Sequence, residues 1–247
     1  LAGSYAPAPA DNGCTTPCTQ TIALLPGSPA IDAAGACNEP TDQRGTPRTP
    51  GLCDTGAYEA WDCTDAMNVS SETDLGFAIG CYNVAVAGSV TTVVLGADVV
   101  LSAALPPIAN AVGASLVIDG AGHGVDGDGV VQHVLVQDDG DIAITALEIR
   151  GAIVNGYTIN NGPAQIIGST FTGNGGSGVF IHGSGTNSNV VKGNYIGTNA
   201  SGTAAVGNDI GVFILEGRNN TVGGSSSGER NVISGNRHGV YISGTST

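Results

Sequence analysis

The chain has 247 residues, a formal net charge of −14 and only 11% charged residues. Its length fits one long repetitive fold or about two ordinary domains. Forty glycines and 4% aromatic residues indicate many tight turns and few bulky core side chains, because glycine readily adopts the positive φ angles that such turns require. The acidic charge argues against nucleic acid and anionic membranes as partners, and no run of about 20 apolar residues is present for membrane insertion.

The charge is unevenly distributed along the chain. Residues 1–149 contain 18 acidic and 2 basic residues, a net charge of −16, whereas residues 150–247 contain 3 acidic and 5 basic residues, a net charge of +2. We interpret the acidic part as a solubilising surface, with calcium binding as the functional alternative.

The first 25 residues are rich in alanine, proline and threonine, which predicts an extended linker. The first ten residues lack the basic start and apolar centre of a signal peptide. We therefore expect a mature chain or an excised portion of a longer one.

All cysteines lie in the first third of the chain. Six cysteines allow 15 pairings, of which we favour the local set 14–18, 37–53 and 63–81. Metal binding is the alternative, although no histidine precedes His123. Disulfides would place the protein in an oxidising, extracytoplasmic setting. The predicted disulfide residues are Cys14, Cys18, Cys37, Cys53, Cys63 and Cys81.

Residues 26–60 combine polar positions at fixed spacing. The pattern consists of Gly27-Ser-Pro-Ala-Ile-Asp32, Asp42-Gln-Arg-Gly45, Arg48 and Cys53-Asp-Thr-Gly-Ala-Tyr-Glu59. It resembles the closing segment of bacterial surface β-helix proteins, the choice-of-anchor Q proteins. The resemblance implies a segment at the end of a β-helix, near its anchor. Such a cap would cover an open sheet edge, which otherwise invites pairing with other chains, although a plain surface loop is the alternative.

Residues 61–83 predict a capping region with a short helix. Ser71-Glu-Thr-Asp74 is a helix start similar to a capping box, with acidic residues in the first turn. Leu75, Ala78, Ile79 and Tyr82 then fall on one helical face. We expect this helix to lie across the first coil of the fold that follows, with Cys63 and Cys81 holding it in place.

Residues 84–247 contain a series of short apolar strands. The order of strand, Leu105-Pro-Pro-Ile108, strand and Asp119-Gly-Ala-Gly-His123 resembles the opening coils of the pectin-lyase-like, right-handed parallel β-helix superfamily. The resemblance implies an all-β solenoid and says little about activity. Predicted strands lie at residues 90–95, 98–101, 115–123 (running into a turn), 134–136, 141–149 and 165–167.

One phrase occurs three times, and its recurrence supports the solenoid. The copies are Gly173-Asn-Gly-Gly-Ser-Gly-Val-Phe-Ile181, Gly207-Asn-Asp-Ile-Gly-Val-Phe-Ile214 and Gly235-Asn-Arg-His-Gly-Val-Tyr-Ile242, preceded by a fainter copy, Asn155-Gly-Tyr-Thr-Ile159. A strand that returns at intervals of this size indicates one coil per interval. Asn174, Asn208 and Asn236 hold one position in successive copies, which predicts a stacked asparagine ladder rather than a ligand site.

Two pairs of acidic residues are the candidate metal ligands. Asp126 and Asp128 are two apart, as are Asp139 and Asp141, and residues two apart on an extended chain face the same way. Each pair is therefore a candidate calcium site, with solvated turn carboxylates as the alternative.

Catalysis would require residues of the same part of the chain. A polysaccharide hydrolase would use acids in pairs, such as Asp139 and Asp141, and a lyase would use calcium with a base such as Arg150 or Lys192. The aromatic residues of the repeat are interpreted as one column of the core or an inward stack. That column comprises Tyr157, Phe180, Phe213 and Tyr241.

These observations predict a right-handed parallel β-helix with a disulfide-stapled N-terminal region and a short capping helix. Residues 1–60 would form a closing segment that docks on a preceding copy or module, residues 61–83 the capping region, and residues 84–247 a β-helix open at its C-terminal end. The repeat of residues 178–186 at 239–247 leaves that last coil unfinished.

We expect a structural or adhesive protein of the extracellular space or cell surface, without enzymatic activity, catalytic residues or any cofactor except calcium. It would be a head-to-tail filament subunit or one module of a long surface array, whose partners are other copies of itself, without nucleic acid binding or membrane insertion. The alternatives are a carbohydrate-binding or polysaccharide-degrading β-helix protein, with polysaccharide as its partner, and a solenoid that binds ice or another protein.

Overall fold

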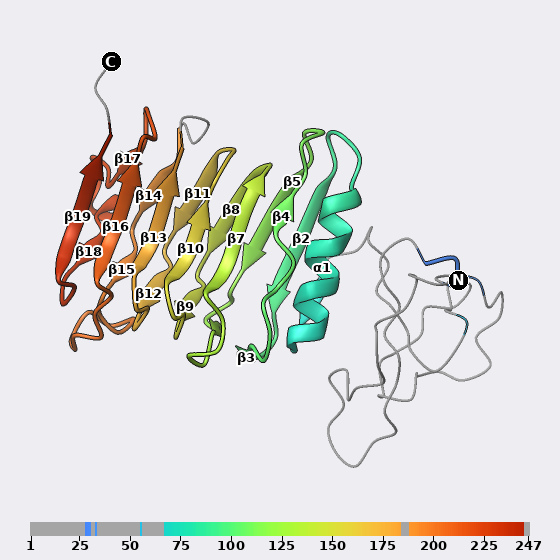
Figure 1. Ribbon diagram of the computed structural model, residues 1–247, viewed down its shortest axis with the longest axis horizontal. Helices are drawn as coiled ribbons and strands as arrows, with labels where there is room; N and C mark the ends of the chain where they lie inside the picture. The colour runs from blue at the N-terminus through green and yellow to red at the C-terminus, as the bar shows by residue number, and fades with distance from the viewer. Residues whose placement is uncertain (1–27, 31–32, 34–54, 56–66, 184–187, 245–247) are drawn as a thin grey trace, which may run out of the picture.

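The computed structural model describes residues 28–30, 33, 55, 67–183 and 188–244. This part of the chain forms a parallel β-solenoid of about seven turns with one α-helix at one end (Figure 1). The solenoid predicted from the repeated phrase is therefore confirmed. The predicted closing segment and all predicted cysteines except Cys81 lie outside the described residues, apart from residues 28–30, 33 and 55.

Three parallel sheets run along the solenoid, and each coil contributes one strand to each sheet. Sheet 1 contains β1 (Met67–Val69), β2 (Val90–Leu95), β5 (Ser115–Asp119), β8 (Asp141–Thr145), β11 (Ala164–Ile167), β14 (Val190–Lys192) and β17 (Thr221–Val222). Sheet 2 contains β3 (Val99–Val100), β6 (Gly124–Asp126), β9 (Glu148–Arg150), β12 (Thr170–Thr172), β15 (Tyr195–Ile196) and β18 (Val232–Ile233). Sheet 3 contains β4 (Ile108–Ala109), β7 (His133–Asp139), β10 (Asn155–Ile159), β13 (Ser177–His182), β16 (Ile210–Leu215) and β19 (His238–Ser243).

The core is built from columns of β-branched side chains that point inward from successive coils. In sheet 1, Val93, Ile118, Ile144, Ile166 and Val191 occupy paired positions of neighbouring strands, and all are at most 1% exposed. Burying one such side chain stabilises the fold by roughly 1.5–3 kcal/mol. Because side chains alternate across a strand, the same register turns every second residue outward.

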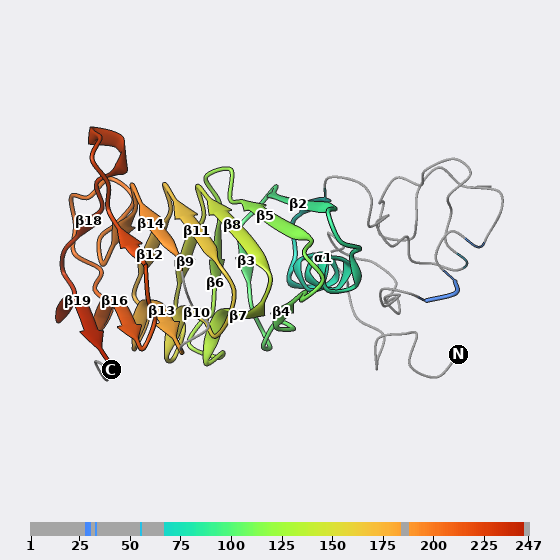
Figure 2. The ribbon, with the colours of Figure 1, turned by 90° about the horizontal axis from the view of Figure 1, so that it is seen from above.

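Helix α1 (Glu72–Val84) lies across one end of the coils (Figure 2). Its N-cap is Ser71, whose hydroxyl oxygen accepts a hydrogen bond from the Asp74 N–H at 3.2 Å, which satisfies one of the free donors of the first turn. The predicted capping helix is confirmed, and its predicted apolar face is buried. That face comprises Leu75, Ala78, Ile79 and Tyr82, with Phe77 and Cys81 buried as well.

Polar contacts fix α1 to the coils beneath it. Glu72 accepts hydrogen bonds from the N–H groups of Ser102 and Ala103, at 3.1 and 2.8 Å. Asn110, buried below the C-terminal end of the helix, donates to the carbonyls of Tyr82 and Ala85 at 2.7 and 2.9 Å. The end of the solenoid at α1 is therefore closed by both apolar and polar contacts. Among the described residues, no helix has the length and apolar character to cross a membrane.

Replacing Ile144 tests the inward assignment of its column. Ile144→Ala should lower the free energy of unfolding by about 2–5 kcal/mol, because it leaves a cavity in a closely packed core. Thr145→Ala, at the neighbouring outward position, should cost less than about 1 kcal/mol. Urea unfolding followed by circular dichroism measures both, and equal losses would contradict the assignment.

Candidate functional site

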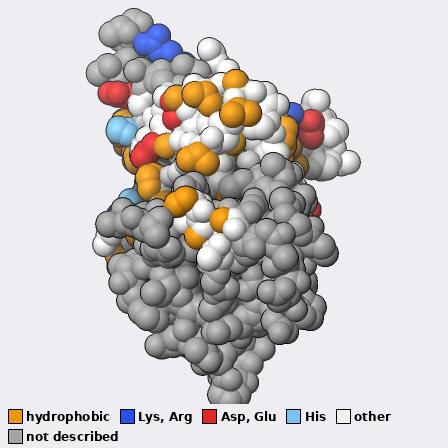
Figure 3. Space-filling model, turned by 90° about the vertical axis from the view of Figure 1, so that its right-hand side faces the viewer, with side chains coloured by type: hydrophobic (Ala, Val, Ile, Leu, Met, Phe, Trp, Pro, Cys, Tyr) orange, Lys and Arg blue, Asp and Glu red, His pale blue; other side chains and the backbone are white. Residues whose placement is uncertain are grey.

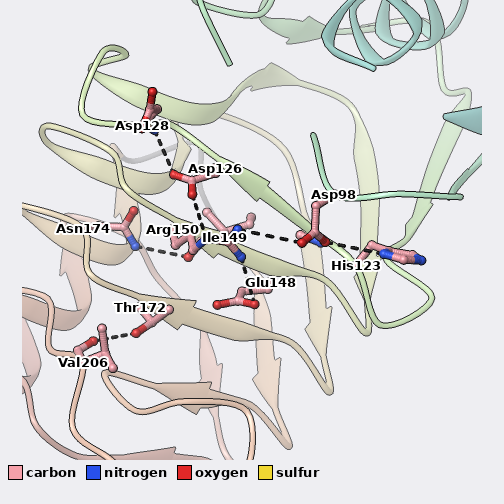
Figure 4. A network of polar contacts seen from close by, with 11 residues as sticks. Asp98, His123, Asp126, Asp128, Glu148, Ile149, Arg150, Thr172, Asn174 and Val206 are labelled. Atoms are coloured by element: carbon pink, nitrogen blue, oxygen red, sulfur yellow. Dashed lines mark hydrogen bonds and ion pairs between the residues drawn. The ribbon is translucent and has the colours of Figure 1, made fainter. Parts of the chain in front are cut away.

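The densest group of charges in the described structure surrounds Arg150 on the outer face of sheet 2 (Figure 4). The Arg150 Nε lies 2.8 Å from the Asp126 Oδ2, and its Nη1 lies 3.1 Å from the Glu148 Oε2. The Nη2 lies 3.9 Å from the Asp98 Oδ2. The Nδ1 of His123 lies 3.5 Å from the other oxygen of Asp98.

The strand register places these residues together. Glu148 and Arg150 lie on β9 on either side of the buried Ile149, so both side chains point outward. Asp126, on β6, is the partner of Arg150 in the parallel pairing of β6 and β9. Asp98 directly precedes β3 in the coil before that, so one guanidinium connects three successive coils.

The Arg150 cluster is an ion-pair network in which three carboxylates share one guanidinium. Partial burial by itself lowers the pKa of Arg150, but the hydrogen bond to Asp126 and the charges of Glu148, Asp126 and Asp98 outweigh it and raise the pKa above its ordinary value. Asp126 also accepts a hydrogen bond from the Asp128 N–H at 2.8 Å, and Asp98 accepts one from the Gly124 N–H at 2.9 Å. The carboxylates of this cluster thus form ion pairs and hydrogen bonds that join neighbouring coils.

Neither pair of predicted calcium ligands lies on one continuous extended strand. Asp128 has a φ of 49° in the turn that follows β6, and Asp126 accepts a hydrogen bond from its N–H. Asp139 ends β7 and Asp141 begins β8, with Gly140 between them at a φ of 107°. The premise that two-residue spacing turns each pair the same way is therefore wrong, because a corner separates the members.

Within residues 67–183 and 188–244, no group of three or more His, Cys, Asp or Glu side chains has a geometry that would hold a metal ion. Calcium binding stays a prediction. The two basic residues proposed for a lyase are also apart, since Arg150 lies on sheet 2 and Lys192 on sheet 1, where its Nζ lies 2.9 Å from the Glu229 Oε1.

The predicted asparagines form a ladder at the corner between sheets 2 and 3. The Nδ2 of Asn174 donates to the Oδ1 of Asn208 at 2.9 Å, and the Nδ2 of Asn208 donates to the Oδ1 of Asn236 at 2.9 Å. The backbone N–H groups of Asn174 and Asn208 donate to the same oxygens, at 3.0 and 2.9 Å. The ladder satisfies donors of buried corner residues, which would otherwise cost stability.

Two further ladders, not predicted from the sequence, occupy the other two corners. Asn189 donates to the Oδ1 of Asn220, and Asn194 donates to the Oδ1 of Asn231, in each case from both the side-chain amide and the backbone N–H. The sequence could have predicted these ladders, because the segments that start at Asn189, Asn220 and Asn231 are similar to one another. Every corner of the last coils therefore carries a carboxamide.

The expected aromatic column is wrong in membership and in direction. Tyr157 pairs with Val179 and is fully buried, whereas Phe180, Phe213 and Tyr241 occupy the next, outward column together with Thr158. The rings of Phe180 and Phe213 have centroids 5.0 Å apart, and those of Phe213 and Tyr241 are 5.1 Å apart. These three rings, which we call the aromatic row, run along the outside of sheet 3.

The end of the solenoid opposite α1 has no further strand among the described residues. We call this the open end, formed by β17, β18 and β19, which are the last strands of sheets 1, 2 and 3. Val240 and Ile242 of β19 are 45% and 71% exposed, although their partners Val212 and Ile214 on β16 are 0% and 5% exposed. An inward column thus continues to the end of the stack and is left unburied there.

A polar atom of the open end is also without a partner. The Nδ2 of Asn220 is buried and makes no hydrogen bond in the described structure.

At the same end of the solenoid, a hydrogen bond from Lys192, and after it hydrogen bonds from Ser226, lower the pKa of Glu229 from 4.5 to about 2. Any stability from this ion pair is therefore present above the ordinary carboxyl pKa and lost as the pH falls toward 2.

Apolar side chains are also exposed near α1. Figure 3 views this end and shows hydrophobic side chains gathered on the part formed by described residues. Val84, at the end of α1, is 65% exposed, and Val86 and Val90, which follow it, are 74% and 63% exposed. These three valines are thus exposed beside a helix whose own apolar face is buried.

Comparison with protein-family models, with curated proteins and with solved structures gave no significant match for the chain. The two family resemblances therefore stay predictions, and the function has to be argued from the geometry of the solenoid.

Replacing Arg150 tests the structural role of its cluster. Arg150→Met should lower the free energy of unfolding by about 1–2 kcal/mol, a value reduced by solvent screening because the side chain is 30% exposed. Arg237→Met, which removes the exposed pair with Asp209, should cost less than about 0.5 kcal/mol. Urea unfolding at neutral pH measures the difference, and an unaffected Arg150→Met variant would contradict the role.

Proposed function

We propose that the protein is a structural or adhesive solenoid of the extracellular space or cell surface that assembles head to tail. In this proposal, residues 1–60 of one copy cover the open end of the preceding copy. The observation that carries it is the continuation of the buried column of sheet 3 into exposed Val240 and Ile242. An uncovered edge strand with apolar side chains is a template for a further strand.

The positions of the two ends support a polar assembly. The described chain begins the solenoid at β1, beside α1, and the open end lies at the opposite end of the stack (Figure 1). A segment that precedes β1 in one copy and contacts the open end of another makes a contact between two different surfaces. Contacts of this kind do not close on themselves and generate filaments.

Charge favours the same contact. Residues 1–60 contain six acidic and two basic residues, a net charge of −4, whereas residues 217–244 contain three arginines and one glutamate, a net charge of +2. Opposite charges on two surfaces accelerate their association and select their orientation.

The finer features of the proposal rest on the sequence. They are a right-handed, pectin-lyase-like winding, a closing segment of the choice-of-anchor Q type at residues 26–60, and disulfides that harden the N-terminal region. Among the described residues, the carboxylates of the Arg150 cluster are committed to one guanidinium, which favours a structural protein over a hydrolase or lyase.

Carbohydrate binding is the second candidate function, favoured by the aromatic row. Aromatic rings on an outer face contact the apolar faces of sugars, and the row follows the axis of the solenoid for three coils. The rings also contact one another, which explains the row equally well as a stabilising stack.

Blocking the open end tests the assembly. The wild-type chain should form oligomers whose length grows with concentration, and the double variant Val240→Asp/Ile242→Asp should be monomeric, because it places charge on the edge that another copy would bury. Both side chains are exposed, so the variant should fold. Val100→Asp, at a 55% exposed position of sheet 2, is the control and should assemble like the wild type.

Sedimentation velocity and negative-stain microscopy provide the measurement. A wild-type chain that stays monomeric at about 100 μM would overturn the proposal, since a contact of useful affinity is populated at that concentration. Assembly by the double variant to the same extent as the wild type would do so as well.

The aromatic row is tested separately, by glycan-array binding of the wild type and of Phe213→Ala. Carbohydrate binding predicts that captured glycans lose at least about tenfold in affinity when the central ring is removed. Gln165→Ala, at an exposed position of sheet 1, should leave binding unchanged, and an array without captured glycans would rule out this second function.

A further inference from the structure

Every step of the three asparagine ladders has the same pattern of hydrogen bonds. The carboxamide oxygen of the later coil accepts two bonds from the asparagine of the earlier coil, one from its backbone N–H and one from its Nδ2. Each asparagine thus offers two donors to the coil that follows it. The four steps join Asn174 to Asn208, Asn208 to Asn236, Asn189 to Asn220, and Asn194 to Asn231.

At the open end, the side-chain oxygen of the last asparagine in each ladder accepts hydrogen bonds from the coil before it. The Nδ2 atoms of Asn231 and Asn236 donate back to the carbonyls of Val191 and Ile196, both at 2.8 Å, as those of the inner asparagines of the same ladders also do. Asn220 does not, and its Nδ2 is buried without an acceptor. The open end therefore contains a buried, unfilled donor at the corner where the preceding asparagine, Asn189, donates to an oxygen of the next coil.

A buried donor without an acceptor costs about 1–3 kcal/mol, and this cost disappears when an oxygen reaches it. A carboxylate oxygen suits the position well, because it accepts two hydrogen bonds and makes stronger bonds than a neutral oxygen. Residues 1–60 supply six carboxylates with a net charge of −4, and the coil that carries Asn220 has a net charge of +2.

We propose that Asn220, with Asn231 and Asn236 at the other two corners, sets the register in which residues 1–60 of a second copy bind the open end. In this arrangement a carboxylate oxygen of the incoming segment takes the place of the next asparagine oxygen at the Asn220 corner. The inference rests on the proposed head-to-tail assembly and adds the residue that fixes its alignment. Without such a polar contact, an edge strand pairs with slipped registers more readily.

Asn220→Asp separates this contact from the fold. The aspartate keeps the oxygen that accepts from the N–H and Nδ2 of Asn189, and it removes only the unpaired Nδ2 donor. Self-association should weaken at least about tenfold, because the donor is lost and a carboxylate faces an incoming carboxylate. The thermal midpoint of the monomeric variant should fall, because a carboxylate oxygen replaces a buried amide, and circular dichroism measures whether the variant keeps the fold.

Asn219→Asp is the matched control. It adds the same charge one residue away, at an exposed position whose φ of 55° aspartate tolerates. Its self-association constant, measured by sedimentation equilibrium, should stay within about twofold of the wild type, since a solvated charge contributes little.

The outcomes distinguish this inference from the assembly itself. Full association of Asn220→Asp, with a monomeric Val240→Asp/Ile242→Asp variant, would leave the assembly standing and overturn the role of Asn220. Equal weakening by Asn219→Asp would assign the effect to net charge and overturn it as well. A wild-type chain without self-association would overturn both proposals, because a longer chain or another protein would then be the occupant.

A second measurement applies if Asn220→Asp does not fold. Wild-type association should weaken by at least about threefold between 0.05 and 0.5 M NaCl, because salt screens contacts between carboxylates and a positively charged surface. Association that is independent of salt would contradict a carboxylate at the Asn220 corner.

Discussion

A coil of a parallel solenoid satisfies its backbone hydrogen bonds only through the coils on either side of it. The sheets of this protein are purely parallel over six or seven strands, so each strand requires two neighbours in register. The same requirement applies to the side chains, because an inward column is buried only where a further coil covers it. Ile214 and Ile242, in one column, are 5% and 71% exposed for this reason.

The corners satisfy the groups that the strands leave out. Where the chain leaves one sheet for the next, its N–H groups have no strand partner, and carboxamides at all three corners accept from them. On the outer face of sheet 2, ion pairs also join neighbouring coils, since Arg150 contacts carboxylates of three successive coils. Contacts between neighbouring coils, rather than a single central core, thus hold the molecule together, as is typical of repeat proteins.

The repeated phrase predicted the coils because glycine, asparagine and β-branched residues return at each corner and strand. Aligning Gly156 with Gly178 places Tyr157 beside Val179, inside the core, so the misassigned aromatic column came from matching residue type instead of position. The pairing of Asp126 with Arg150 was not accessible, since it depends on the lengths of the loops between strands. The expectation that each acidic pair shares one extended strand was wrong, because Asp128 lies in a turn and Gly140 has a positive φ.

Helix α1 has a consequence for how the molecule responds to force. It seals one end of the stack with a buried apolar face and with hydrogen bonds to Ser102 and Ala103, while β19 at the other end is held from one side only. Within the described residues, the coil of β19 thus lacks contacts that the coils beside α1 have, so fraying of this part of the chain should start at β19. Any ligand or neighbour that covers β19 acts as a clamp on the whole stack.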